Sequence, residues 1–212
     1  DRFTLRSNID SEIKKWLKAG FTFSLADSKQ EIGADNNTIM NALTYQPMVA
    51  VSNPDGSFDG PEDVWMPANP IGMASIRENY NKKYNFRANS YIEATIAKYF
   101  TFKTEYSTDY NWTHTYYFEP SYRFGVLESN TRTSKRAKND SKYWSWRNIL
   151  SYDNTFNGNH KVNLMIGQEM SEYSWENLGG AVTGFLTNTT HDLNAGNVKE
   201  SSATGASGAS SI

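Results

Sequence analysis

Carboxylate side chains offer the first chemistry that the sequence could support. Four of them fall close together at Asp55, Asp59, Glu62 and Asp63, and oxygen ligands of this kind suit Ca²⁺. Their spacing differs from the regularly spaced acidic loop of calcium-binding helix pairs, in which ligands recur at every second position. We therefore predict no metal site, although Asn53-Pro54-Asp55-Gly56 has the composition of a turn.

Histidine, cysteine and serine give no catalytic pattern either. None of the three histidines, His114, His160 and His191, has a second histidine four residues away. The chain has no Cys, which excludes disulfide scaffolds, thiol nucleophiles and thiolate zinc sites. The G-x-S-x-G sequence that carries a serine nucleophile is also missing. The sequence therefore predicts a protein that is not an enzyme and that uses no cofactor.

Recognition of a solute is the chemistry that the sequence supports better. Between residues 31 and 80, Tyr45 and Trp65 offer aromatic faces for stacking, and Asn69 offers an amide for hydrogen bonds. A simpler interpretation is a loop that packs on itself. Because connections of such length are usually functional, we take Tyr45, Trp65 and Asn69 as candidate substrate contacts.

The segment from Phe100 to Trp112 indicates how such residues are positioned. Every second side chain is aromatic or Thr, and the side chains between them are polar or charged. A period of two predicts a β-strand with one apolar face. Similar alternation predicts about six strands of roughly 9 to 13 residues, which suits tilted membrane strands; they lie near residues 3–13, 17–25, 84–94, 100–112, 144–153 and 162–170.

The predicted connections alternate in length. Short turns are expected at 14–16, at 96–99 and at Asn157-Gly158-Asn159, because Asn-Gly is a strong hairpin signal. Long loops are expected at about 30–83, 113–142 and 172–212, and the last includes a Ser/Gly/Ala tail from Ser201. Short turns at one end and long loops at the other are typical of outer-membrane barrels.

Composition agrees with an antiparallel transmembrane β-barrel. The 212 residues are 38% hydrophobic and 14% aromatic, with a net charge of −2 that implies no nucleic-acid partner. Mean hydropathy is −0.68 and no apolar run is long enough for a membrane helix. Rings near the predicted strand ends, such as Tyr106, Tyr110 and Trp112 and then Tyr143, Trp144 and Trp146, suit an interfacial girdle. The alternative is a soluble β-sandwich that binds glycans with the aromatic face as its core.

One predicted loop also carries a basic run, which suits an anionic lipopolysaccharide or an acidic partner, although a solvated loop face is the simpler interpretation. Its members are Arg132, Lys135, Arg136, Lys138 and Lys142.

Three segments carry a family resemblance: RFTLRSNID at 2–10 with WLKAGFTF at 16–23, Asn69-Pro70-Ile71, and WRNILSYDNTFNGNHKVNLMIGQE at 146–169. The chain resembles the SusC/RagA family of TonB-dependent outer-membrane transporters of Bacteroidetes, over most of residues 1–191. The resemblance implies a 22-stranded barrel around an N-terminal plug, driven through TonB, with a SusD-like lipoprotein over its mouth and oligosaccharides or peptides as substrates.

Under this resemblance, residues 1–212 are expected to be an internal piece of the barrel, facing outer-membrane lipid. The plug and the segment that contacts the TonB complex would lie outside it, in the missing N-terminal region.

Overall fold

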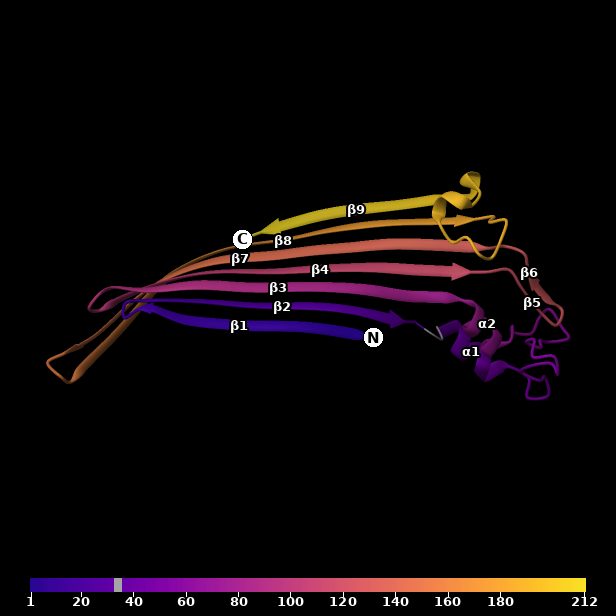
Figure 1. Ribbon diagram of the computed structural model, residues 1–212, viewed down its shortest axis with the longest axis horizontal. Helices are drawn as coiled ribbons and strands as arrows, with labels where there is room; N and C mark the ends of the chain where they lie inside the picture. The colour runs from indigo at the N-terminus through magenta and orange to yellow at the C-terminus, as the bar shows by residue number, and fades with distance from the viewer. Residues whose placement is uncertain (33–35) are drawn as a thin grey trace.

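A single large antiparallel sheet dominates the computed structural model, which describes residues 1–32 and 36–212. Residues 33–35, inside the first predicted loop, lie outside the described residues. Seven strands follow the order β1-β2-β3-β4-β7-β8-β9 (Figure 1). Their bounds are β1 Arg2–Lys14, β2 Leu17–Glu31, β3 Glu78–Ala97, β4 Phe100–Glu119, β7 Thr133–Phe156, β8 His160–Thr183 and β9 Ser202–Ser211.

The remaining elements are short and lie in the connections. They are α1 Asn36–Thr44, α2 Pro70–Ile76, the hairpin β5 Tyr122–Phe124 with β6 Leu127–Ser129, and the 3-10 turns η1 Leu193–Ala195 and η2 Val198–Glu200. No helix among the described residues is long and apolar enough to cross a bilayer.

The sheet has two chemically different faces, as the alternation predicted. Phe86 of β3 lies opposite Tyr110 of β4 and Leu25 of β2, so apolar side chains of successive strands share one face. Arg87, one residue along, lies opposite Asp109 on the other face. We call these the apolar face and the polar face. Each is a direct consequence of the period of two together with in-register pairing.

Short turns and long connections lie at opposite ends of the sheet (Figure 1). Strands β1–β2, β3–β4 and β7–β8 are joined at 15–16, 98–99 and 157–159, whereas 32–77, 120–132 and 184–201 connect strands at the other end. Asn157 and Gly158 have φ angles of 50° and 74°, which explains their place in a tight hairpin. The predicted alternation of connections is confirmed, and we call the second end the loop end.

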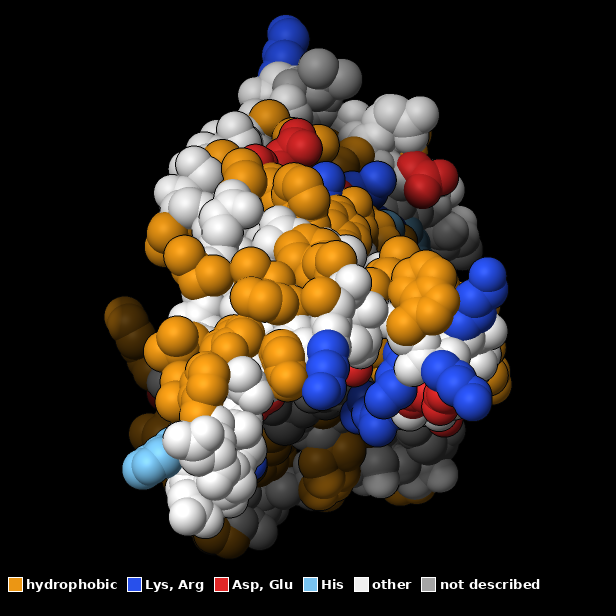
Figure 2. Space-filling model, turned by 90° about the vertical axis from the view of Figure 1, so that its left-hand side faces the viewer, with side chains coloured by type: hydrophobic (Ala, Val, Ile, Leu, Met, Phe, Trp, Pro, Cys, Tyr) orange, Lys and Arg blue, Asp and Glu red, His pale blue; other side chains and the backbone are white. Residues whose placement is uncertain are grey.

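The sheet buries almost nothing by itself. Fully buried hydrophobic side chains among the described residues gather at the loop end; they are Met73, Phe118, Phe124, Val182 and Phe185. The accessible surface is 14333 Å², whereas a globular protein of 24.0 kDa exposes about 9,900 Å². Figure 2, which looks at the short-turn end, shows hydrophobic side chains gathered over a broad exposed patch. The apolar face therefore needs an apolar partner from outside the chain.

Strand number and length differ from the prediction. The sheet has seven strands instead of about six, and β7 and β8 contain 24 residues each. The predicted loops at 30–83, 113–142 and 172–212 accordingly shrink to the connections above. Alternation fades toward the loop end, because charged and polar side chains such as Lys82, His114 and Lys138 there occupy positions on the face that is apolar elsewhere.

The seventh strand, β9, replaces the expected Ser/Gly/Ala tail. Its backbone pairs with residues 172–181 of β8. Small side chains give no alternating pattern, so the pairing is set by the exposed edge of β8. At Gly208 an added Cβ would lie 2.9 Å from Trp175 Nε1, so the glycine leaves room for the indole.

The aromatic side chains also differ in position from the expected girdle at strand ends. Tyr106 and Trp146 lie directly opposite each other on the apolar face, well inside β4 and β7. The rings of Tyr110 and Trp112 stack with centroids 5.4 Å apart. Tyr143 lies on the polar face, because it is paired with Asp109 of β4. The girdle is internal because the strands continue beyond it.

The soluble sandwich alternative does not describe this fold. Apart from the large sheet, the described residues contain only the two-stranded β5–β6 sheet. A sandwich requires a second sheet packed over the aromatic face. The fold is instead all-β and antiparallel, with the form of a barrel segment.

Candidate functional site

The polar face of β3 and β4 carries a continuous hydrogen-bond network. Asn85 Nδ2 donates to Asp109 Oδ1 at 3.0 Å and to Asn111 Oδ1, and Arg87 Nε contacts Asp109 Oδ2 at 2.6 Å. One step nearer the short turns, Asn89 Nδ2 donates to Glu105 Oε1 at 2.8 Å. Each side chain is held by a partner across the strand pair, so the network presents a preorganised polar wall.

This wall borders a groove of about 1100 Å³ over β1 to β4. Arg2, Arg6 and Asn8 of β1 line one side, while Asn111 and Thr113 of β4 line the other. A surface of charged and amide groups suits passage or binding of polar solutes.

At the loop end, the first and second connections interlock around Phe124 of β5. The Phe124 ring meets Phe58 edge-on, with centroids 5.9 Å apart, and stacks on Tyr122 at 5.1 Å. The backbone of Val126 donates to Pro61 O at 3.1 Å. Burial, followed by the charge of Glu119, raises the pKa of Tyr122. The two connections therefore form one packed unit.

The third connection packs onto the same end through Phe118, the penultimate residue of β4. Phe118 stacks on the His191 ring at 3.8 Å and meets Phe185 edge-on at 5.9 Å. Asn188 Oδ1 accepts from Arg132 Nε at 2.7 Å, and also from the backbone and hydroxyl of Ser121. All three connections are thus tied together by ring contacts and hydrogen bonds between side chains.

Asn69, a predicted substrate contact, has a structural place instead. Its side chain is fully buried and caps α2, with Oδ1 accepting from the backbone N–H groups of Ile71 and Gly72. Nδ2 donates to Val51 O at 2.7 Å and to Asp59 O at 2.8 Å. Since all of its hydrogen-bonding capacity is used inside the loop, a solute has no access to this amide.

Trp65 and Tyr45 differ from Asn69, and from each other, in the exposure of their side chains. Trp65 is 89% exposed, and its ring is open to a solute or a partner. Tyr45 is half-buried, and among the described residues its buried hydroxyl has no hydrogen-bond partner. Burial, followed by the charge of Asp59, raises the pKa of Tyr45. The structure does not bring the three predicted residues together around one cavity.

An exposed apolar surface on the first connection was missed by the sequence analysis. Helix α1 exposes Ile39, Met40 and Leu43 at 51%, 58% and 76%. Met48 and Trp65 are exposed further along the same connection. Helical periodicity at 39–43 was the signal available, although a helix of nine residues gives little of it.

Two members of the acidic cluster, Asp55 and Asp63, accept hydrogen bonds from residues two positions further along the chain. The Asp55 carboxylate accepts from the backbone and hydroxyl of Ser57, and these hydrogen bonds hold the pKa of Asp55 below its usual range. Asp63 accepts from the backbone of Trp65 at 3.0 Å. In the described part of the chain, His, Asp and Glu side chains form no group suited to a metal ion.

An ion pair at the base of the loop end was also missed. Arg77 Nε lies 2.6 Å from Glu119 Oε2, and Tyr117 donates its hydroxyl to the same oxygen at 2.7 Å. Both ionic side chains are about one-fifth exposed. They come from β4 and from the residue before β3, so only the pairing of distant segments reveals them.

No protein-family model matches the chain. It is 24% identical over 203 residues to TonB-dependent receptor P26 of Formosa agariphila, and 25% identical over 178 residues to TonB-dependent receptor P39 of the same organism. These matches cover 93% and 83% of this chain. The chain spans 20% and 17% of the length of these two relatives.

Solved structures give the same result for the fold. The chain superposes on the RagAB peptide transporter with a TM-score of 0.78 at 19% identity, covering 98% of this chain and 25% of that one. A closed-closed state of the RagAB peptide importer gives a TM-score of 0.77 at 18% identity. These matched proteins are receptors and transporters, in agreement with the prediction that the chain is not an enzyme. The chain is therefore similar in sequence to TonB-dependent receptors, and it has the fold of a section of the RagAB transporter structures.

Proposed function

We propose that the whole protein imports oligosaccharides or peptides across the outer membrane, and that residues 1–212 form a contiguous section of its barrel wall. The three connections at the loop end face the cell exterior in this proposal. The apolar face contacts lipid, and the polar face borders the path of the solute.

One observation carries the proposal: the same strands present an exposed aromatic face and a hydrogen-bonded polar face. A large apolar face exposed to water is unfavourable. Contact with the acyl chains of a membrane removes that penalty. In this arrangement the hydrogen-bond network around Asp109, on the polar face, is in contact with water. A wall with lipid on one side and water on the other is the arrangement of a membrane barrel.

The partner that we propose at the loop end is a SusD-like lipoprotein. The exposed side chains Ile39, Met40 and Leu43 of α1 support this, because exposed apolar patches mark protein interfaces. Energy would be supplied through TonB by a segment outside this chain, as the family resemblance implies. The matched RagAB structures are named as peptide transporters, which favours testing peptides beside oligosaccharides.

The experiment uses the full-length protein in its native membrane. Outer-membrane fractionation, detergent extraction and heat-modifiable gel mobility test for the barrel. Uptake of labelled peptides and oligosaccharides is then compared between the wild type and a strain that lacks TonB. Recovery as a soluble protein, or uptake that is independent of TonB, would contradict the proposal.

A matched pair of variants tests the lipoprotein surface. Leu43→Asp replaces a side chain that is 76% exposed in α1, and we expect it to reduce co-purification of the lipoprotein. Ile166→Asp changes a side chain that is 71% exposed on the apolar face of β8. This control should impair membrane insertion instead. Equal co-purification by the Leu43 variant and the wild type would refute the proposed interface.

A further inference from the structure

The apolar face does not remain apolar up to the loop end. Beyond the aromatic side chains, the register brings Lys82 of β3, His114 of β4 and Lys138 of β7 into one row across three strands. Arg136 lies one step nearer the loop end, opposite Tyr116. We call Lys82, Arg136 and Lys138 the cationic patch.

The register also divides the basic run seen in the sequence. Arg136, Lys138 and Lys142 belong to the apolar face, whereas Lys135 belongs to the polar face. Lys82 joins them from a strand more than fifty residues away, in a segment that the sequence analysis assigned to a loop. The patch therefore exists only in the folded sheet.

The cations of the patch have no acidic partner. Within residues 1–32 and 36–212, no carboxylate lies within 4.0 Å of Lys82, Arg136 or Lys138. Asp140, Glu31 and Glu78 lie on the same face, but none of them makes an ion pair with these cations in the described structure. Glu31 pairs with Lys29 instead, and Glu78 pairs with His191. Uncompensated like charges that share a sheet face repel one another. An anion is the missing counterpart.

Aromatic rings contact two of these cations. Tyr116 lies beneath two of them, with Lys82 Nζ 5.6 Å and Arg136 Cζ 4.9 Å from its ring centroid. The Tyr116 ring in turn stacks on Tyr80 at 4.8 Å. Arg136 is further held by a hydrogen bond from Nη2 to His191 O at 3.1 Å. A packed aromatic floor with cations above it suits an anionic head group attached to an apolar body.

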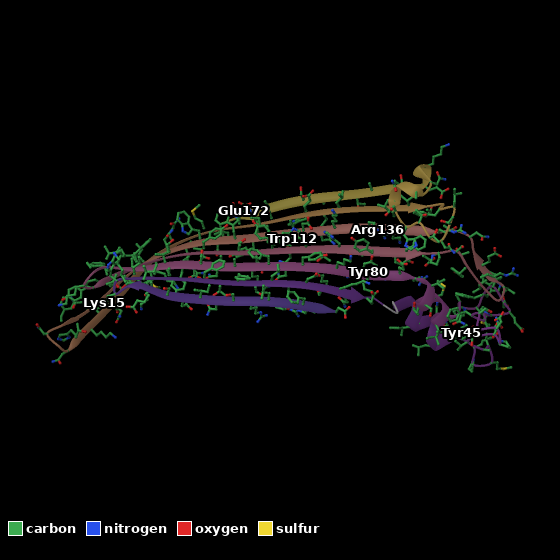
Figure 3. All side chains as sticks on the ribbon, viewed as in Figure 1. Lys15, Tyr45, Tyr80, Trp112, Arg136 and Glu172 are labelled. Atoms are coloured by element: carbon green, nitrogen blue, oxygen red, sulfur yellow. The ribbon has the colours of Figure 1, made fainter. Side chains whose placement is uncertain are left out.

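The height of the patch fits the surface of a bilayer. On β4 the apolar face runs from Phe100 to Trp112, which is about twelve steps of about 3.3 Å, or about 40 Å along the strand. At a tilt of about 45° this corresponds to about 28 Å along the membrane normal, close to the apolar band of about 25 Å in barrels. His114 and its neighbours are the first residues beyond that band. In Figure 3, Tyr80 and Arg136 lie nearer the loop end than Trp112 does.

We propose that the cationic patch binds the phosphate of an anionic lipid in the outer leaflet, with the acyl chains of that lipid against the aromatic side chains below. The inference rests on the membrane placement in the proposed function. The lipid phosphate supplies the negative counter-charge for Lys82, Arg136 and Lys138. The exposed rings contact the acyl chains. The lipid contacts the outside of the barrel, away from the solute path.

The test compares the full-length receptor with the triple variant Lys82→Gln, Arg136→Gln and Lys138→Gln. The probes are lipid A with its phosphates, the same lipid after phosphate removal, and inorganic phosphate, and bound copies are counted by native mass spectrometry. Each surface cation contributes about fivefold in affinity, so the triple variant should bind phosphorylated lipid A about a hundredfold more weakly. The wild type should prefer the phosphorylated lipid by a similar factor, and free phosphate should not compete at equal concentration.

The matched control replaces two cations that lie on the polar face of the same strands. Lys83→Gln with Lys135→Gln should leave lipid binding unchanged. A second variant, Lys82→Arg with Lys138→Arg, keeps the charge and should keep the binding. Heat-modifiable mobility, measured on every variant, separates a failure of insertion from a failure of lipid binding. Equal binding of both lipids by the wild type, equal losses in the control, or effective competition by free phosphate would overturn the proposal.

Discussion

Replacement of Asn69 tests whether its side chain shapes the first connection or contacts a solute. Asn69→Ala removes the cap of α2, at a cost of about 1 kcal/mol. It also removes two donated hydrogen bonds, to Val51 O and Asp59 O, at about 1 kcal/mol each. The sum is about 3 kcal/mol of local stability, because the site is fully buried and water does not replace the lost partners.

The assay is amide hydrogen exchange of the full-length receptor over residues 51–73. A local loss of about 3 kcal/mol corresponds to exchange about a hundredfold faster in this segment. Strands β7 and β8 should exchange at the wild-type rate, because they do not contact Asn69. Trp65→Ala is the comparison, and it should leave exchange unchanged because its ring is 89% exposed.

The reasoning is refuted if Asn69→Ala exchanges like the wild type over residues 51–73 while solute uptake is lost. That result would return Asn69 to the solute contacts that the sequence suggested. Asn69→Asp adds a second check, because a carboxylate still accepts from Ile71 and Gly72 but no longer donates. Its exchange should therefore lie between that of the wild type and that of the Ala variant.

Three further predictions concern other elements. Gly208→Val should loosen β9, because a side chain there collides with Trp175; faster exchange at 202–211 is the expected readout, at a cost of about 1–3 kcal/mol, and unchanged exchange would contradict it. Gly60→Ala should separate the first two connections, because its Cβ would lie 2.1 Å from the β5 backbone; limited proteolysis should then cut at 120–132, and continued resistance would count against the interlock. The Asp55 turn should be stable above the usual pKa of 3.8 and should weaken as pH falls through the lower folded value; exchange at Ser57 should accelerate there, but not in Asp55→Asn, and a matching acceleration in that variant would exclude Asp55 as the cause.

The strands could be predicted from sequence because their signal is local. Between Phe100 and Trp112, lipid and water impose different side chains on alternate positions, so the pattern is legible without any tertiary contact. Asn157-Gly158 likewise requires φ above zero, and the hairpin follows from that requirement. The family resemblance added the expectation of a transporter, and the comparisons agree with it.

The candidate site was harder to predict, because its residues depend on partners far along the chain. Asn69 and Trp65 were equally plausible solute contacts in the sequence, yet one is fully buried and the other is 89% exposed. Exposure of a loop side chain is decided by what packs over it. For Asn69 this includes residues 51 and 59, whose carbonyl groups accept its hydrogen bonds.

By itself, the sequence determined which side of each predicted strand is apolar, since a period of two leaves no freedom once a strand forms. Only the tertiary structure decided where strands end, that β9 pairs with β8, and which cations share a surface. Lys82 and Lys138 become neighbours of His114 through cross-strand register. Register is a property of two paired strands, so no single stretch of sequence contains it.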